Sequence, residues 1–218
     1  MNLCEKSGAI ETIREKLNFA KHSKIPVSLY SDAENTTKFA FGYVMEVTDT
    51  FILFADISPN GDYDGFTARE TQKVYKVEWN DKYGRRLEKI YKLKNQKHDV
   101  INCRTGDIIT DLLYFALTKR LIVNIELFES DTKDTVGFVS FINNGIVGFQ
   151  NIDENGESDG ECICRLRDVD VLQCDSSDEQ LLKLLNENIQ STGADGDVRL
   201  CKTDETNRDV QFPPHFTK

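Results

Sequence analysis

Residues 57–65 read ISPNGDYDG, and residues 152–160 read IDENGESDG. The two stretches share an isoleucine, an Asn-Gly pair and a closing Asp-Gly pair at the same spacing, ninety-five residues apart. A pattern that returns at one fixed offset indicates an internal repeat. The sequence therefore predicts one small unit built twice, so the function must be sought in the unit, in the pairing of the units or in their differences.

The same offset aligns residues outside these stretches and gives the repeat its extent. It places Gly42 over Gly137, and an offset of ninety-six aligns residues 17–20 with residues 113–116. The one-residue step is expected in the polar stretch 31–38, because an exposed loop tolerates insertions. We therefore predict three segments: a first unit at residues 1–96, a second unit at residues 97–190 and a flexible tail at residues 191–218.

Hydrophobic spacing predicts the same order of elements in both units. Apolar residues at steps of three and four predict an opening helix at residues 7–22 capped by Ser7, and its counterpart at residues 105–119 capped by Thr105. Five short segments rich in β-branched and aromatic residues follow between residues 26 and 79, which is typical of strands. A closing helix is expected at residues 81–92 and at residues 177–189, the latter with a capping-box pair of Ser176 and Glu179 or of Ser177 and Gln180.

A helix followed by five antiparallel strands is the plan of a small, strongly bent barrel. Gly42 and Gly137 fall in the middle of a predicted strand, where a residue without a side chain permits a sharp bend or a close backbone approach. The predicted fold class is therefore mainly β with flanking helices (α+β). In detail, we expect two tandem five-stranded bent-sheet small barrels of the Sm-like or SH3-like kind, each preceded and followed by a helix.

One motif in the first unit resembles a known family. Residues 42–54 read GYVMEVTDTFILF, which is similar to the first motif of the Sm and Sm-like family. This resemblance implies a helix before a five-stranded bent sheet, and an RNA pocket formed by an Asp and an Asn at one turn and an Arg-Gly pair before the fifth strand. Asp49 matches the Asp, but Leu53 and Gly148 stand where the Asn is expected, and residues 70–73 and 165–168 contain no Arg-Gly. The resemblance therefore implies the fold better than the RNA site.

Composition favours a cytoplasmic protein that has no membrane segment. The chain has 218 residues, 39% hydrophobic and 29% charged, and no apolar run approaches the length of a membrane span. The first residues lack a basic region followed by an apolar stretch, so no secretory leader is expected. Six cysteines occur without a Cys-x-x-Cys pair. Cys162, Cys164 and Cys174 are conceivable thiolate ligands, but no histidine lies near them in sequence, so buried free thiols and no metal are expected.

Charge is divided unequally along the chain. Residues 1–96, here called the first half, hold 15 Lys and Arg against 14 Asp and Glu, whereas residues 97–218, the second half, hold 12 against 23. Between residues 73 and 97, cations alternate with aromatic residues, the combination that binds single-stranded nucleic acid. The candidate nucleic-acid-binding residues are Lys73, Tyr75, Lys76, Trp79, Lys82, Arg85, Arg86 and Lys89. A solvated helix face explains the same pattern, and a pI near 4.9 works against attraction of a polyanion.

The repeated loops are the second candidate site. Their shared residues are Asn60, Gly61, Asp64, Gly65, Asn155, Gly156, Asp159 and Gly160. Oxygen-bearing side chains alternate from residue 153 to residue 159, as in a calcium loop, but no bidentate Glu stands at the twelfth position. The other interpretation is a hairpin turn between the third and fourth strands, in which each Asn-Gly pair supplies positive φ angles.

No catalytic constellation is recognisable, so we do not expect an enzyme, a cofactor or a small-molecule substrate. The leading hypothesis is a non-enzymatic interaction or regulatory module that binds a protein partner or itself and serves as a scaffold. Two alternatives stay open: an RNA- or single-stranded nucleic-acid-binding regulator, and a cation or small-ligand sensor. Residues 212–216 read FPPHF, which suggests that the predicted tail either is disordered or docks into a groove.

Overall fold

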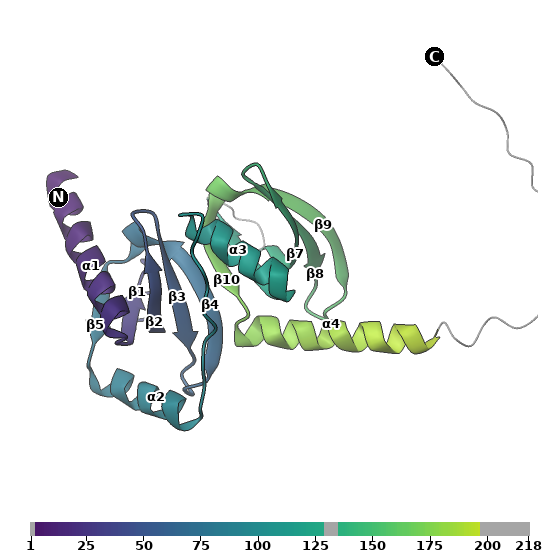
Figure 1. Ribbon diagram of the computed structural model, residues 1–218, viewed down its shortest axis with the longest axis horizontal. Coiled ribbons are helices and arrows are strands. Elements are labelled where there is room, and N and C mark those ends of the chain that lie inside the picture. The colour runs from purple at the N-terminus through teal and green to yellow at the C-terminus, as the bar shows by residue number, and fades with distance from the viewer. Residues whose placement is uncertain (1–2, 129–134, 197–218) are drawn as a thin grey trace, which may run out of the picture.

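The computed structural model describes residues 3–128 and 135–196, and this part of the chain forms four α-helices and one open, antiparallel sheet of ten strands (Figure 1). The mixed α+β character predicted from the sequence is thereby confirmed. The strand order across the sheet is β5-β1-β2-β3-β4-β10-β6-β7-β8-β9. The first half contains α1 (Leu3–Ser23), β1 (Val27–Tyr30), β2 (Ala40–Val47), β3 (Phe51–Ile57), β4 (Tyr63–Glu70), the 3-10 turn η1 (Thr71–Lys73), β5 (Lys76–Trp79) and α2 (Lys82–Leu93). The second half contains α3 (Ile108–Lys119), β6 (Ile122–Leu127), β7 (Thr135–Asn143), β8 (Ile146–Ile152), β9 (Ser158–Arg165), the 3-10 turn η2 (Leu166–Asp168), β10 (Val169–Cys174) and α4 (Ser177–Gly196).

Strand pairing follows the same register in both halves. Gly42 pairs with Asp56 between β2 and β3, and Gly137 pairs with Asn151 between β7 and β8. The register shifts after Val44 in the first pair of strands and after Val139 in the second. Residues ninety-five positions apart therefore occupy the same place in their ladders, and we call such residues counterparts.

The two mid-strand glycines allow the close backbone approach that the sequence predicts. A Cβ atom at Gly42 would lie 2.0 Å from the carbonyl oxygen of Ala55, and one at Gly137 would lie 2.2 Å from that of Gln150. No side chain fits at either distance, so the prediction that these positions need glycine is confirmed.

The halves meet where β4 pairs with β10, and we call this junction the seam. Ala68 lies opposite Leu172 there, and both side chains are fully buried. Helix α3 covers the seam and contacts β3, β4, β7 and β10, so that the largest hydrophobic core contains residues of both halves (Figure 1). The Phe115 ring of α3 packs edge-on against Phe66 of β4, with centroids 5.5 Å apart. The seam is thus a buried core and not a surface contact.

Each remaining helix covers one smaller apolar cluster. Helix α1 lies against β2 and packs Leu17 and Ala20 into a cluster with residues of β1, β2 and β3, and α2 packs Leu87 and Tyr91 over the cluster of Phe41 and Ile57. Helix α4 places Leu182 against the cluster of Ile122, Phe138 and Ile152. None of the helices in the described residues is long and apolar enough to cross a lipid bilayer.

Helix caps differ from the predictions at two of the three places where a cap was predicted. Helix α1 begins at Leu3, so Ser7 lies inside it and does not cap it. Asp107 instead of Thr105 caps α3, because its carboxylate accepts the amide N–H of Ile109 at 3.3 Å and a carboxylate is as effective a cap as a hydroxyl.

The start of α4 agrees with the prediction, whereas its end does not. The amide of Ser176 donates to Glu179 Oε2 at 2.7 Å, which is one of the two bonds of a capping box. Helix α4 continues to Gly196, so residues 191–196 are helical and not part of a tail. The rest of the predicted tail, including residues 212–216, lies outside the described residues.

Candidate interaction surface

Among the described residues, the sheet ends in two strands that have a neighbour on one side only. These are β5, which pairs with β1, and β9, which pairs with β8. On the outer strand β9, Ile163 keeps 68% of its side chain exposed, whereas its counterpart Ala68 at the seam is fully buried. An open strand offers unpaired N–H and C=O groups, so β5 and β9 are the places where a further strand can add.

The repeated Asn-Gly turns lie at the hairpins between β3 and β4 and between β8 and β9. Gly61 has φ +74° and Gly156 has φ +79°, whereas the asparagines before them are not in the left-handed region. The turn interpretation is therefore right for the glycines and wrong for the asparagines. A Cβ atom at Gly61 would lie 2.6 Å from Ile90 of α2, and one at Gly156 would lie 2.7 Å from Leu185 of α4. Each turn thus fixes the position of the following helix.

In the second loop, the Asp153 carboxylate binds groups of the loop itself. The Asp153 carboxylate accepts the amide N–H groups of Asn155 at 2.9 Å and Glu157 at 2.8 Å. These hydrogen bonds, with the Glu157 amide foremost, lower the pKa of Asp153. Within residues 3–128 and 135–196, no group of three or more His, Cys, Asp or Glu side chains is arranged to hold a metal ion. The geometry gives no support to the cation hypothesis.

The Asp-Gly pair that closes each repeated stretch has different surroundings in the two halves. Asp64 Oδ1 accepts the amide N–H of Ser177 at 2.9 Å, and a Cβ atom at Gly65 would lie 2.3 Å from the carbonyl oxygen of Cys174. In the second half, Asp159 is exposed, and no atom of residues 3–128 or 135–196 lies within 4 Å of the corresponding position at Gly160. The first pair is part of the seam, whereas the second lies on the open strand β9.

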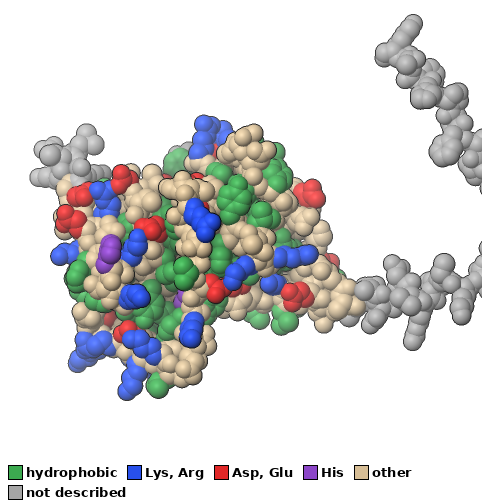
Figure 2. All heavy atoms as spheres, in the orientation of Figure 1, with side chains coloured by type: hydrophobic (Ala, Val, Ile, Leu, Met, Phe, Trp, Pro, Cys, Tyr) green, Lys and Arg blue, Asp and Glu red, His purple; other side chains and the backbone are tan. Residues whose placement is uncertain are grey.

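The candidate nucleic-acid-binding residues are all exposed, on and around β5 and α2. Lys73 is in η1, Tyr75 precedes β5, Lys76 and Trp79 are in β5, and Lys82, Arg85, Arg86 and Lys89 are on α2. Figure 2 shows Lys and Arg side chains gathered over α2. Several of these cations have protein partners: Lys73 pairs with Asp170, Lys76 pairs with Glu78 at 2.8 Å, and Arg85 donates to the carbonyl of Asn80. The fold therefore brings the group together but neutralises part of it.

An aromatic cluster lies beside these cations. Ring centroids of Tyr30 and Phe39 are 5.2 Å apart, those of Phe39 and Tyr83 are 5.7 Å apart, and those of Tyr30 and Tyr75 are 6.4 Å apart. The Lys76 ammonium lies 4.2 Å from the Tyr30 centroid. The Tyr30 hydroxyl donates to Glu78 at 2.7 Å, and this bond raises the pKa of Tyr30. Tyr30 and Phe39 were missed by the sequence analysis because they join the cluster only through strand pairing.

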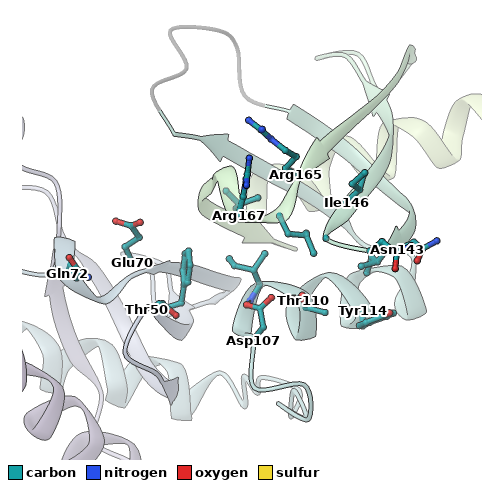
Figure 3. Close-up of a pocket in the computed structure, with 17 residues that line it drawn as sticks. Thr50, Glu70, Gln72, Asp107, Thr110, Tyr114, Asn143, Ile146, Arg165 and Arg167 are labelled. Atoms are coloured by element: carbon teal, nitrogen blue, oxygen red, sulfur yellow. Dashed lines mark hydrogen bonds between the residues drawn. The ribbon is translucent and has the colours of Figure 1, made fainter.

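A groove of about 1030 Å³ runs along α3 beside the seam (Figure 3). Thr50, Glu70 and Gln72 line it from the first half, and Tyr114, Asn143, Arg165 and Arg167 are among its second-half residues. Arg165 pairs with Asp168 at 2.5 Å. Because acids, amides, cations and apolar groups alternate around it, the groove's chemistry selects no single ligand class.

Four cysteines have side chains that the structure describes, and all four are at least partly shielded from solvent. Cys103, Cys162 and Cys164 are half-buried, and Cys174 is fully buried. Burial raises the pKa of Cys103 and of Cys164 to about 11, so both are protonated at neutral pH. Burial therefore disfavours the thiolate form of these two side chains.

Comparison with models of protein families, with curated proteins and with solved structures finds no significant match to this chain. The site must therefore be interpreted from its own geometry.

Proposed function

We propose that the protein is a non-enzymatic scaffold built from two copies of one small bent-sheet barrel, and that it binds protein partners by adding strands to its open edges β5 and β9. The equal ladder registers of the halves and the equal surroundings of Gly42 and Gly137 support the duplication. Duplicated small barrels present their edges in a fixed relative geometry, which suits a scaffold.

The seam is the observation that carries this proposal. There the second half already binds the first by strand addition, since β10 lies between β6 and β4. Strand addition gives affinity through main-chain hydrogen bonds and specificity through alternate side chains. The same chain leaves one further edge of each half open, so the mode of contact that joins the halves remains available to a partner.

A photo-crosslinking amino acid in place of Ile163, introduced in cells that express the protein, tests the proposal. We expect covalent adducts with protein, identified by mass spectrometry. Val100 is a matched control, because it is also an exposed aliphatic residue, 75% against 68% exposed, but lies in the segment between α2 and α3. Adducts at both positions alike, or no protein adduct at position 163, would contradict strand addition at β9.

A second function, binding of single-stranded nucleic acid, is favoured by the aromatic cluster beside the cations of β5 and α2. Base stacking on such rings contributes about 1–3 kcal/mol per base. We expect a fluorescent oligouridine to bind at low salt and to dissociate as salt is raised, because phosphate contacts release counterions. Replacing Tyr75 and Tyr83 by alanine should weaken binding about tenfold or more. A lack of binding at about 50 mM salt would remove this function.

A further inference from the structure

We infer that the strand added at β9 is β5 of a second copy of this chain, in the register of the chain's own seam. This inference rests on the proposed function and names the partner of the same edge. At the seam, β4 pairs with β10. The counterpart of β4 is β9, and the counterpart of the last residues of β10 is β5. The pairing of β9 with β5 of a second copy would therefore repeat the seam.

The backbone of β9 has the conformation that β4 has at the seam, but no described strand lies beside its outer edge. At the seam, Asp175 follows β10 with φ +61° and lies against Gly65, where a Cβ atom would be 2.4 Å from its carbonyl carbon. Asn80, the counterpart of Asp175, follows β5 with φ +60°. Gly160, the counterpart of Gly65, keeps φ +79° with nothing within 4 Å. Trp79 and Asn80 of another copy have the backbone conformation that fits this space.

The seam register fixes which residues meet. Arg69 pairs with Val171 and Ala68 with Leu172 in the seam. When each residue of the seam pairs is replaced by its counterpart, Ile163 lies opposite Val77 of the second copy, and Glu161 lies opposite its Trp79. Ile163 is 68% exposed and Trp79 is 43% exposed, so the contact removes apolar surface from water on both edges.

A helix cap and the charges of the two edges fit the same register. Asp64 binds the amide N–H of Ser177 across the seam, and the counterparts of this pair are Asp159 and Lys82. Lys82 is the first residue of α2, where a carboxylate is favoured by the helix dipole as well as by the lysine charge. Within β5, Lys76 and Glu78 pair with each other and leave that strand without net charge. Opposite charges therefore meet where Asp159 faces Lys82.

A comparison of α1 with α3 predicts that the contact between copies is less stable than the seam within the chain. Phe19 of α1 is the counterpart, at the ninety-six-residue offset, of Phe115, and it is 58% exposed. However, Lys16 of α1 stands in the place of the fully buried Leu112 of α3. Association between copies is thus more polar than the join within the chain, and we expect it to depend on salt. Because each copy gives one edge and receives on the other, the association is head-to-tail and extends until the last copy meets the first.

Sedimentation velocity of the full-length chain over a range of protein concentrations tests the inference. We expect masses above that of the monomer at low salt and a shift towards monomer at high salt. Ile163→Lys and Gly160→Asn should each weaken association about tenfold or more, which corresponds to at least 1.4 kcal/mol. Asparagine tolerates a positive φ, so Gly160→Asn fills the empty space without forcing the backbone to change. The circular dichroism spectrum of each variant should match that of the wild type, which checks that the variant is folded.

The matched control is Leu184→Lys on α4, an exposed apolar residue, 64% accessible, that belongs to neither β5 nor β9. It should leave association unchanged. A chain that stays monomeric at every concentration overturns the inference, as does association that survives both edge variants or is lost in Leu184→Lys. Photo-adducts at Ile163 with other proteins, from a chain that is monomeric when purified, would overturn this inference alone and leave the scaffold proposal standing.

Discussion

A single missing side chain sets the closest approach of the backbone in each half. Gly42 and Gly137 lie against the carbonyl oxygens of Ala55 and Gln150, at distances that exclude a methyl group. Gly8 in α1 has no atom within 4 Å of its Cβ position. Glycine is thus required for packing at Gly42 and Gly137, whereas Gly8 is a helical residue of low helix propensity.

Alanine substitutions separate these two situations. We expect Gly42→Ala and Gly137→Ala each to lower the free energy of unfolding by about 1–3 kcal/mol, because the strands must move apart to accept the methyl group. The control Gly8→Ala should raise it by up to about 1 kcal/mol through helix propensity. Urea titration measures all three. Unchanged stability in either strand variant would contradict the close approach.

Asp56 is a half-buried acid whose Oδ2 atom is shielded from solvent, an environment that disfavours its charge. Its Oδ2 atom and Nε of Arg69 have no hydrogen-bond partner among the described residues. Burial raises the pKa of Asp56 to about 7, and the charge of Arg69 opposes this rise only in part. The folded protein therefore holds a proton on Asp56 more tightly than the unfolded chain does.

This difference predicts a pH dependence of stability with a definite sign. The unfolded chain releases the Asp56 proton near pH 4 and the folded chain at about pH 7. The free energy of unfolding should therefore fall as pH rises from about 4 to about 7 and then stay level. The Asp56→Asn side chain cannot ionise, so we expect the free energy of unfolding of this variant not to show this fall. Its stability relative to the wild type should be greatest above pH 7. Urea midpoints from pH 4 to pH 8 measure it, with Glu34→Gln on an exposed loop as control. Parallel profiles of Asp56→Asn and wild type would refute it.

At the scale of elements, α1 and α3 hold the same place in their halves but cover different surfaces. Leu112 of α3 is fully buried at the seam, whereas the corresponding residue of α1, Lys16, is exposed. We expect Leu112→Ala to cost about 2–5 kcal/mol of stability because it leaves a cavity in the shared core. Lys16→Ala should change stability by less than about 0.5 kcal/mol. Thermal denaturation compares the two, and similar effects would contradict the assignment of α3 to the seam.

The sequence predicted the elements well because their signals are local. The strands, the mid-strand glycines and the positive φ angles of Gly61 and Gly156 all follow from residue types within a few positions of one another. Helix caps were less predictable, since Thr105 and Asp107 are both good caps and the local geometry decides between them.

The candidate surfaces were less predictable because they depend on long-range pairing. Nothing in the residue types of β4 says that its outer edge pairs with the tenth strand and not with a partner. In the same way, Tyr30 and Phe39 reach Tyr75 and Tyr83 only through the pairing of β1 with β5 and the placement of α2. The basic run was visible in the sequence, but the carboxylates that neutralise part of it were not.

At the scale of the whole molecule, the shared core makes the two halves one folding unit. Phe66 and Ala68 of β4 share a cluster with Leu112, Ile125 and Leu172 of the second half. Exposing the seam in either half uncovers this cluster, so neither half unfolds without a large penalty to the other.

We therefore expect one cooperative unfolding transition. The chain has a single tryptophan, Trp79, which lies in the first half, so its fluorescence follows that half. Far-UV circular dichroism also follows α3 and α4 of the second half. Urea curves from the two probes should coincide. Two separate midpoints would show that the halves unfold independently.

The position of β10 also sets the order of events when the chain is made. The second partner of β4 is β10, the last strand along the chain, so one edge of β4 stays uncovered while about a hundred further residues leave the ribosome. During that interval the nascent first half presents an apolar edge to any neighbouring nascent chain. Premature pairing between polysome neighbours is the hazard that this topology creates, and slow elongation after β5 would increase it.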